Sequence, residues 1–228
     1  MKKLLAISAF VMMPMVAQAQ IVGSAHDMTD ATNAVYTTNA NASVCEFCHV
    51  PHNARTTMNA IWNRADPTGG NAYTWGAESP TVAGTTIPAA IGSSSLKCFS
   101  CHDGSSDIGA LFNGRNYSMQ GADVAAGLLT NNTFIVDQTA MAGNHPVSVR
   151  YPASDNAAGN YNGGASGAFI DTADYVTIAN IVANGNVILY DDAGVSGIEC
   201  GSCHEPHDVT NSYFLRNTLA ASAICTDC

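Results

Sequence analysis

The eight cysteines of this 228-residue chain form four pairs, and each pair has two residues between its members. A histidine directly follows the first three pairs. The pairs are Cys45/Cys48, Cys98/Cys101, Cys200/Cys203 and Cys225/Cys228, and the histidines are His49, His102 and His204. Two thiols at this spacing can bond to one edge of a planar group, and the adjacent imidazole can ligate a metal at its centre.

This C-x-x-C-H pattern is the attachment signature of c-type haem. Each thiol adds to one vinyl group of the porphyrin, and the two intervening residues place both sulfurs along the same edge. The imidazole then ligates the iron axially. Three such motifs in one chain make the interpretation specific, so we predict covalently bound haem c, with its iron, at each of them.

The fourth pair is incomplete, because Cys225-Thr226-Asp227-Cys228 are the last residues given. We expect the natural sequence to continue with a histidine, so that Cys225 and Cys228 attach a fourth haem. Four haems are then expected, three of them at complete motifs. A terminal disulfide is the alternative, although so short a disulfide loop usually serves redox chemistry rather than stability.

Three other uses of cysteine pairs compete with this interpretation. Eight cysteines in an exported chain could form four disulfides. Zinc ribbons also contain C-x-x-C pairs, but they do not require a histidine directly after the second cysteine. Thioredoxin-like redox pairs need a βαβ setting, which the sequence does not indicate around any of the four pairs.

Four histidines remain after the three proximal ones, namely His26, His52, His145 and His207. Low-spin haem irons need a sixth ligand, so we predict these four as distal ligands. Seven histidines and the one expected after Cys228 match four irons with two imidazoles each. Three methionines leave one His/Met-ligated iron open as an alternative: Met58, Met119 and Met141.

Two of the spare histidines lie in a repeated H-x-P-H pattern, at His49 to His52 and at His204 to His207. Residues three apart lie on one face of a turn. Axial ligands approach an iron from opposite sides, so His52 cannot be the second ligand of the iron held by His49, and the same holds for His207 and His204. Each pattern therefore predicts two haems close together.

The first nineteen residues have the features of a secretory signal peptide. A basic start, Met1-Lys2-Lys3, precedes an apolar stretch and the small-x-small site Ala17-Gln18-Ala19. We predict cleavage after Ala19 and a single multihaem cytochrome c domain over 20–228, either periplasmic or extracellular. No other apolar run reaches the ~18 residues of a membrane-spanning helix, so none is expected in the mature chain.

The composition limits the function further. The formal charge is −10, with only eight Lys and Arg residues, which argues against nucleic-acid binding. We expect a mostly irregular, loop-rich fold with short α-helices and few short strands, wrapped around a chain of haems. A short helix is expected at 122–129 and strands at 133–136 and 186–190, with 174–182 ambiguous. A helix is expected within 212–228, with Leu215, Leu219 and Ile224 facing haem.

These motifs resemble the doubled-CxxCH multihaem c-type cytochromes. The resemblance rests on the repeated CxxCH, the CHxPH variants at Cys45–His52 and Cys200–His207, the CHDG after Cys101 and the Asn-His-Pro-Val segment at His145. More narrowly, the arrangement is similar to the tetrahaem extracellular cytochromes that polymerise into conductive filaments. In that group an N-terminal histidine of one subunit can ligate a haem of the next, and the resemblance implies that role for His26. An N-terminal arm can also fold back onto its own chain, and the sequence does not choose between the two routes.

The sequence thus predicts electron transfer by three to four closely packed bis-His haems, at low potential because histidine replaces methionine as the sixth ligand. Its partners would be redox proteins or extracellular acceptors, and it would self-associate into filaments if the narrower resemblance holds. Two alternatives stay open. A multihaem reductase would need one iron with an open position, and a monomeric periplasmic shuttle would not polymerise.

Overall fold

The computed structural model describes residues 20–67, 93–137, 144, 147–151, 175–192 and 195–228. The predicted signal peptide at 1–19 and the predicted ligand His145 lie outside these residues.

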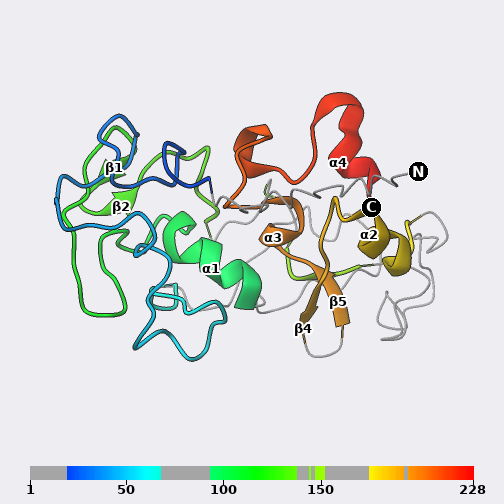
Figure 1. The fold of residues 1–228 in the computed structure, drawn as a ribbon, viewed down its shortest axis with the longest axis horizontal. Coiled ribbons are helices and arrows are strands. Elements are labelled where there is room, and N and C mark those ends of the chain that lie inside the picture. The colour runs from blue at the N-terminus through cyan, green and yellow to red at the C-terminus, as the bar shows by residue number, and fades with distance from the viewer. Residues whose placement is uncertain (1–19, 68–92, 138–143, 145–146, 152–174, 193–194) are drawn as a thin grey trace, which may run out of the picture.

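The fold is loop-rich, as predicted, with short helices and two small antiparallel sheets. The helices are α1 (Ser93–His102), α2 (Ile178–Asn184), α3 (Cys200–Cys203) and α4 (Ala223–Thr226), with the 3-10 turns η2 (Ser212–Phe214) and η3 (Ala220–Ser222). The strands are β1 (Val124–Ala125), β2 (Leu128–Leu129), β3 (Val149–Arg150), β4 (Tyr190–Asp192) and β5 (Val195–Ile198). In Figure 1 the loops around β1 and β2 form one end of the molecule, α2 and α4 form the other, and α1 and α3 lie between them.

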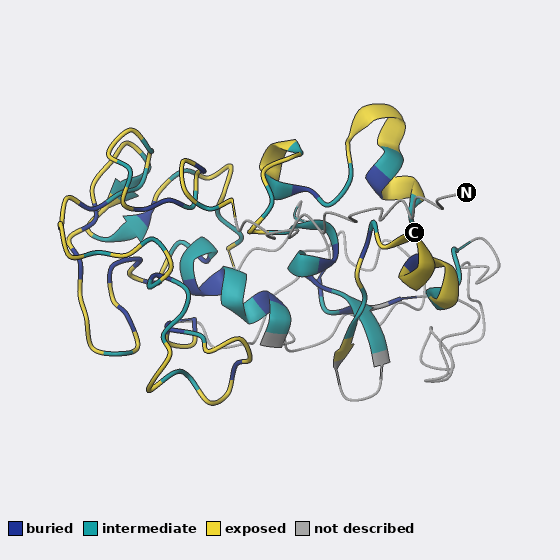
Figure 2. Cartoon of the chain, in the orientation of Figure 1, coloured by how far each residue is buried: buried dark blue, intermediate teal, exposed yellow. Residues whose placement is uncertain are grey.

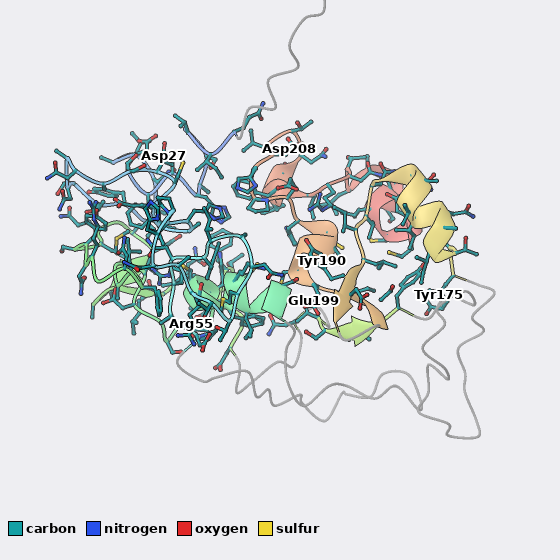
Figure 3. The ribbon with its side chains drawn as sticks, turned by 60° about the horizontal axis from the view of Figure 1, so that its bottom comes forward. Asp27, Arg55, Tyr175, Tyr190, Glu199 and Asp208 are labelled. Atoms are coloured by element: carbon teal, nitrogen blue, oxygen red, sulfur yellow. The ribbon has the colours of Figure 1, made fainter. Side chains whose placement is uncertain are left out.

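A buried carboxylate joins α1 to α3. Glu199 directly precedes α3 and is 3% exposed, and its carboxylate accepts hydrogen bonds from the hydroxyls of Ser95 and Ser148. The Ser95 hydroxyl in turn accepts the backbone N–H of Cys200 at 3.0 Å. Because Ser95 belongs to α1, these bonds fix the second C-x-x-C-H motif against the third. Figure 3 shows Glu199 where the two helices meet.

The helix predicted at 122–129 is wrong, because this segment forms the hairpin of β1 and β2. Val124 pairs with Leu129 and Ala125 with Leu128, which leaves a two-residue turn of Ala126 and Gly127. Both turn residues have positive φ, 52° and 82°, as a type I′ turn requires. A glycine in the middle of the segment therefore ends any helix and closes a hairpin instead.

The strand predicted at 133–136 is also wrong. The Asn131 side chain accepts the N–H of Thr133 at 3.0 Å, and its carbonyl accepts the N–H of Phe134 at 2.9 Å. Such local bonds compete with strand pairing and outweigh the β-propensity of the segment. The resulting turn brings Phe134 and Val136 alongside His102, whose carbonyl accepts the Val136 N–H at 2.8 Å.

Only the end of the strand predicted at 186–190 is present, since β4 starts at Tyr190. Upstream of it, the N–H of Ile188 donates to the Ser202 carbonyl of α3 rather than to a strand. The ambiguous segment 174–182 is resolved in part, because α2 begins at Ile178 with the Thr177 hydroxyl capping it. β5 is the central strand of the second sheet, between β3 and β4.

The helix expected within 212–228 is present as α4, which leads into the last cysteine pair, but it is short and two 3-10 turns, η2 and η3, precede it. Non-helical residues interrupt the segment, with φ of 59° at Tyr213 and 52° at Ala221. Leu215 and Ile224 are buried, as expected of apolar residues that face inward, whereas Leu219 is 56% exposed.

Among the residues that the structure describes, the buried apolar side chains form three separate clusters rather than one core, and the buried segments are correspondingly short in Figure 2. Each cluster packs against a cysteine of the C-x-x-C pairs. Cys48 contacts the cluster around Phe47 and Ile108, Cys200 contacts the cluster of Phe99 and Val147, and Cys203 and Cys228 contact the cluster around Tyr151 and Ile224. The apolar packing is therefore concentrated where the predicted cofactors attach.

Gly121 offers a test of how the segment after the predicted cleavage site is held. A Cβ at Gly121, with φ of +121°, would lie 2.1 Å from the backbone oxygen of Ala34, whereas Gly114, with φ of +86°, has open space around it. We expect Gly121→Ala to lower the free energy of unfolding by about 2–5 kcal/mol, from backbone strain and steric overlap together. Gly114→Ala, which lacks the overlap, should cost about 1–2 kcal/mol. Denaturant unfolding of the two variants measures the difference, and equal losses would contradict the close approach to Ala34.

Candidate haem-binding site

All four cysteine pairs lie in the described part of the chain, and all eight cysteines are free thiols. The second and third pairs are on α1 and α3, and the fourth spans the end of α4. The first pair is in a tight turn, in which the N–H of His49 donates to the Cys45 carbonyl at 2.8 Å. One turn of helix or an equivalent tight turn thus brings both thiols of a pair to the same side, as thioether attachment requires.

The four pairs follow one another in space in their sequence order. Cys48 of the first pair interacts electrostatically with Cys101 of the second. The thiol of Cys98, also in the second pair, is hydrogen-bonded to Cys200 of the third. Cys203 of the third pair lies near Cys225 and Cys228 of the fourth. Cofactors held at these pairs would be neighbours in the order one, two, three, four.

Burial keeps several of these thiols protonated. It raises the pKa of the Cys48 thiol to about 12, with Cys101 adding to the effect. It also raises the pKa of Cys228 to about 11, helped by the neighbouring Cys203. The hydrogen bond to Cys200, followed by burial, raises the pKa of Cys98. These low-polarity surroundings suit an apolar porphyrin edge.

The three proximal histidines share one hydrogen-bonding arrangement. In each, Nδ1 lies close to a backbone carbonyl oxygen, at 2.7 Å from Ala60 for His49, 2.7 Å from Phe134 for His102 and 2.8 Å from Tyr213 for His204. A carbonyl can only accept, so Nδ1 carries the proton and Nε2 keeps a free lone pair. This is the tautomer of a histidine that ligates a metal through Nε2.

Two of these carbonyls belong to residues in the left-handed region. Ala60 has φ of 66° and Tyr213 has φ of 59°, both unusual for residues other than glycine. Backbone conformations of this kind cost free energy and persist where the surrounding structure requires them. This role could not be predicted from the sequence, since neither residue belongs to a recognisable motif.

His207 lies opposite the proximal histidine of the first motif. The ring centres of His49 and His207 are 6.0 Å apart and their planes differ by 20°. Nδ1 of His207 is 3.1 Å from Oε1 of Glu205, whose other oxygen accepts from Arg216 at 2.9 Å. The Glu205 carboxylate therefore holds the same Nδ1-protonated tautomer in His207 that carbonyls hold in the proximal histidines.

His26 lies opposite the proximal histidine of the second motif. Its ring centre is 6.1 Å from that of His102, with the planes at 68°. Phe214 stacks on His26, with ring centres 4.4 Å apart and planes at 7°. Burial, and then the nearby His102, lowers the pKa of His26 to about 4, and burial also lowers the pKa of His102. Both imidazoles are therefore neutral at pH 7, the form that ligates a metal.

The two other predicted distal ligands are not placed against an imidazole. His52 is exposed, and it makes no ring contact among the residues that the structure describes. His145 lies outside those residues. Met58 and Met119 are buried, and Met119 packs in the apolar cluster around Phe47.

Two buried N–H donors near the first motif lack a hydrogen-bond partner in the described chain, as would be expected next to a bound haem. Trp62 Nε1 and Arg64 Nε are buried without a hydrogen-bond partner in the described chain. The guanidinium of Arg64 donates to the carbonyls of Ile108, Ser100 and Asp107, and the side chain influences the thiol of Cys48. A buried cation and an unpartnered N–H group suit an anionic acceptor such as a haem propionate. Together with the histidine tautomers, they make this donor set compatible with haem c.

One family model matches the chain, over residues 193–228, and it describes a doubled CXXCH motif. The matched segment contains both the third and the fourth cysteine pairs. It supports a multihaem c-type cytochrome-like feature at this end of the chain, and thereby covalent haem binding and electron transfer. No curated protein matches the chain.

Two further findings concern membrane-spanning helices and groups of metal-binding side chains in the described part of the chain. None of the described helices is long and apolar enough to cross a membrane. Among the same residues, no three histidine, cysteine, aspartate or glutamate side chains gather as a metal-binding group.

Arg64 was not apparent from the sequence, and it can be tested directly. Arg64 is 2% exposed, and its guanidinium donates to the carbonyl of Ser100 in the second motif and to those of Asp107 and Ile108 shortly after it. We expect Arg64→Met to lower the free energy of unfolding by about 3 kcal/mol or more, because three buried carbonyls lose a charged donor. Arg55→Met, which breaks the partly exposed ion pair with Asp66, should cost about 1 kcal/mol or less. Chemical denaturation of both variants would contradict the structural role of Arg64 if the two losses were equal.

Proposed function

We propose that the chain is an electron carrier that holds covalently bound haem c along most of its length. The observation that carries this proposal is the shared state of His49, His102 and His204, each directly after a C-x-x-C pair. A carbonyl fixes the proton of each on Nδ1 and leaves Nε2 free for a metal. Three independent occurrences of one arrangement argue against a fortuitous contact.

The chain's own residues would do three things for the haem. The cysteine pairs fix its edge, the histidines hold its iron on both sides, and the apolar clusters exclude water. When bound, the haem supplies a reversible one-electron change between ferric and ferrous iron. Two imidazoles on an iron would leave no position for a substrate there and would favour a lower potential than His/Met ligation.

A fourth haem at Cys225 and Cys228 is part of the proposal. The doubled-motif match extends over this pair, and Cys228 packs in the same apolar cluster as Cys203. The Cys228 carbonyl accepts the hydroxyl of the fully buried Tyr151 at 2.5 Å and the Val176 N–H at 2.9 Å. The pair is thus anchored to the rest of the fold in the same way as the complete motifs.

The spatial order of the pairs supports a path through the molecule. Cys98 of the second motif is hydrogen-bonded to Cys200 of the third, and electrostatic interactions link Cys48 with Cys101 and Cys203 with Cys225. Electron transfer becomes much faster as the distance between redox groups shortens. We therefore propose sequential transfer along the four positions, in a single domain over 20–228 that is exported by a signal peptide at 1–19 to the periplasm or the cell exterior.

Redox proteins or extracellular acceptors are the proposed partners. Self-association into a filament is a second proposal, and the exposed imidazole of His52 supports it, because this predicted ligand meets no other imidazole within the described residues. A reductase would instead need an iron with an open position, and carbon monoxide binding to the reduced protein distinguishes that alternative.

Intact mass measurement of the exported protein tests the proposed function. We expect the mass of the mature chain plus four covalent haems, and the loss of one haem in a Cys225→Ser, Cys228→Ser variant. Cys98→Ser, Cys101→Ser should likewise remove one haem from the second motif. A chain without covalent haem would overturn the proposal, and an unchanged haem count in the Cys225 variant would assign the fourth pair another role.

A further inference from the structure

We infer that His207 is the sixth ligand of the haem iron at the first motif and that His26 is the sixth ligand at the second. Both ligands would come from the same chain as the iron that they bind. This inference rests on the proposed haem binding and adds to it the pairing of ligands, which the sequence left open.

The distances between imidazole rings carry the inference. Two metal–imidazole bonds of about 2 Å on opposite sides of an iron, with each ring centre about 1 Å behind its nitrogen, separate the ring centres by roughly 6 Å. The His49–His207 and His26–His102 distances are 6.0 Å and 6.1 Å. A directly stacked pair in the same molecule, His26 and Phe214, is much closer at 4.4 Å. Spacing does not by itself distinguish these pairs from other ring contacts, since Tyr151 and Tyr175 are also 6.0 Å apart. What distinguishes them is that both are pairs of imidazoles at the spacing of axial ligands.

Each pair joins one proximal and one distal histidine. His49 and His102 belong to C-x-x-C-H motifs, whereas His207 and His26 do not. In three of the four rings, Nδ1 is occupied by a carbonyl or carboxylate oxygen, so Nε2 is available to the iron. Neither pair unites two proximal histidines, which would require one imidazole to serve two irons.

The positions of both distal histidines are fixed by the fold. The carbonyl of His207 accepts the backbone N–H of Gln20 at 2.9 Å, so the segment that carries His26 is tied to the loop that carries His207. Phe214 holds the His26 ring from one side, and the Tyr213 carbonyl next to it holds His204. The third motif and its flanking loop therefore position ligands for the first two.

With this pairing, the two histidines of the second H-x-P-H pattern ligate different haems. His207 reaches the first motif, while its neighbour His204 belongs to the third, which places these two haems close together. His26 is engaged within its own chain, so a filament would need an intersubunit ligand other than His26.

Electron paramagnetic resonance of the oxidised holoprotein distinguishes the two irons. Nearly parallel imidazole planes give a rhombic low-spin signal, and nearly perpendicular planes give a highly anisotropic one. The interplanar angles are 20° for His49–His207 and 68° for His26–His102. We expect His207→Ala to remove one rhombic signal and His26→Ala to remove one anisotropic signal. Each variant should also gain one carbon monoxide-binding haem per chain when reduced.

Nearby substitutions serve as controls, and methionine replacements give a second test of each ligand. Asp208→Asn next to His207, and Val22→Ala near His26, change side chains outside the proposed ligand pairs and should leave both signals intact. Methionine can replace histidine as a sixth ligand, so His207→Met and His26→Met should keep a low-spin iron with a raised potential. The methionine variants test the pairing if an alanine variant does not fold.

Haem count separates failure of the pairing from failure of the proposed function. If the variants carry a full set of covalent haems but keep both signals and bind no carbon monoxide, the pairing is wrong. Loss of the anisotropic signal in His207→Ala, or of the rhombic one in His26→Ala, would also overturn it. A wild-type protein without covalent haem would overturn the proposed function, and the pairing with it.

Glu205 gives an independent readout of the His207 assignment. A carboxylate that accepts from Nδ1 makes an imidazole a stronger ligand and favours the ferric state. We therefore expect Glu205→Gln to shift the potential of the rhombic-signal haem upward and leave the anisotropic signal unchanged. Asp208→Asn, which alters a carboxylate bonded to Thr210 instead, should leave the potential unchanged. A shift confined to the anisotropic-signal haem would contradict the assignment.

Discussion

The arrangement of the molecule depends on one repeated hydrogen bond, from the Nδ1 of a proximal histidine to a backbone carbonyl. It occurs at His49, His102 and His204, although the three carbonyls come from unrelated loops. Each loop must leave regular secondary structure to present its oxygen, and two of them use residues with positive φ to do so. Much of the irregular backbone thus has a definite purpose, which is to fix the orientation of an imidazole.

The scarcity of regular structure has a second cause in the division of the apolar residues. Three small clusters, each in contact with a cysteine of the motifs, would leave an ordinary protein of this size with little continuous core. Large apolar cofactors bonded to those cysteines would extend the clusters toward one another. If the proposed function is correct, the haems form part of the core, and the chain only has to provide apolar side chains that pack around them.

The loop-rich fold was predicted correctly from the sequence, and the cysteine pairs and histidines could be proposed as a site because covalent attachment imposes a strict local spacing. It could not pair distal with proximal histidines, since His26 and His102 are brought together by contacts between remote segments. Regular structure was predicted less well. The helix predicted at 122–129 is wrong because Gly127 closes a hairpin there, and the 133–136 segment follows its Asn131 turn rather than its β-propensity. The roles of Arg64 and Glu205 could not be predicted, because an isolated charged residue in a sequence does not indicate its partner in the fold.

The link between α1 and α3 has a consequence for the speed of electron transfer. Tunnelling rates fall steeply with each added ångström, so loosely held redox groups would transfer electrons at a rate that fluctuates with every thermal motion. Glu199, Ser95 and Ser148 tie the second and third motifs together through buried hydrogen bonds inside the protein. A fixed spacer of this kind would leave the outer loops free to meet different partners while the rate of the central step stays constant.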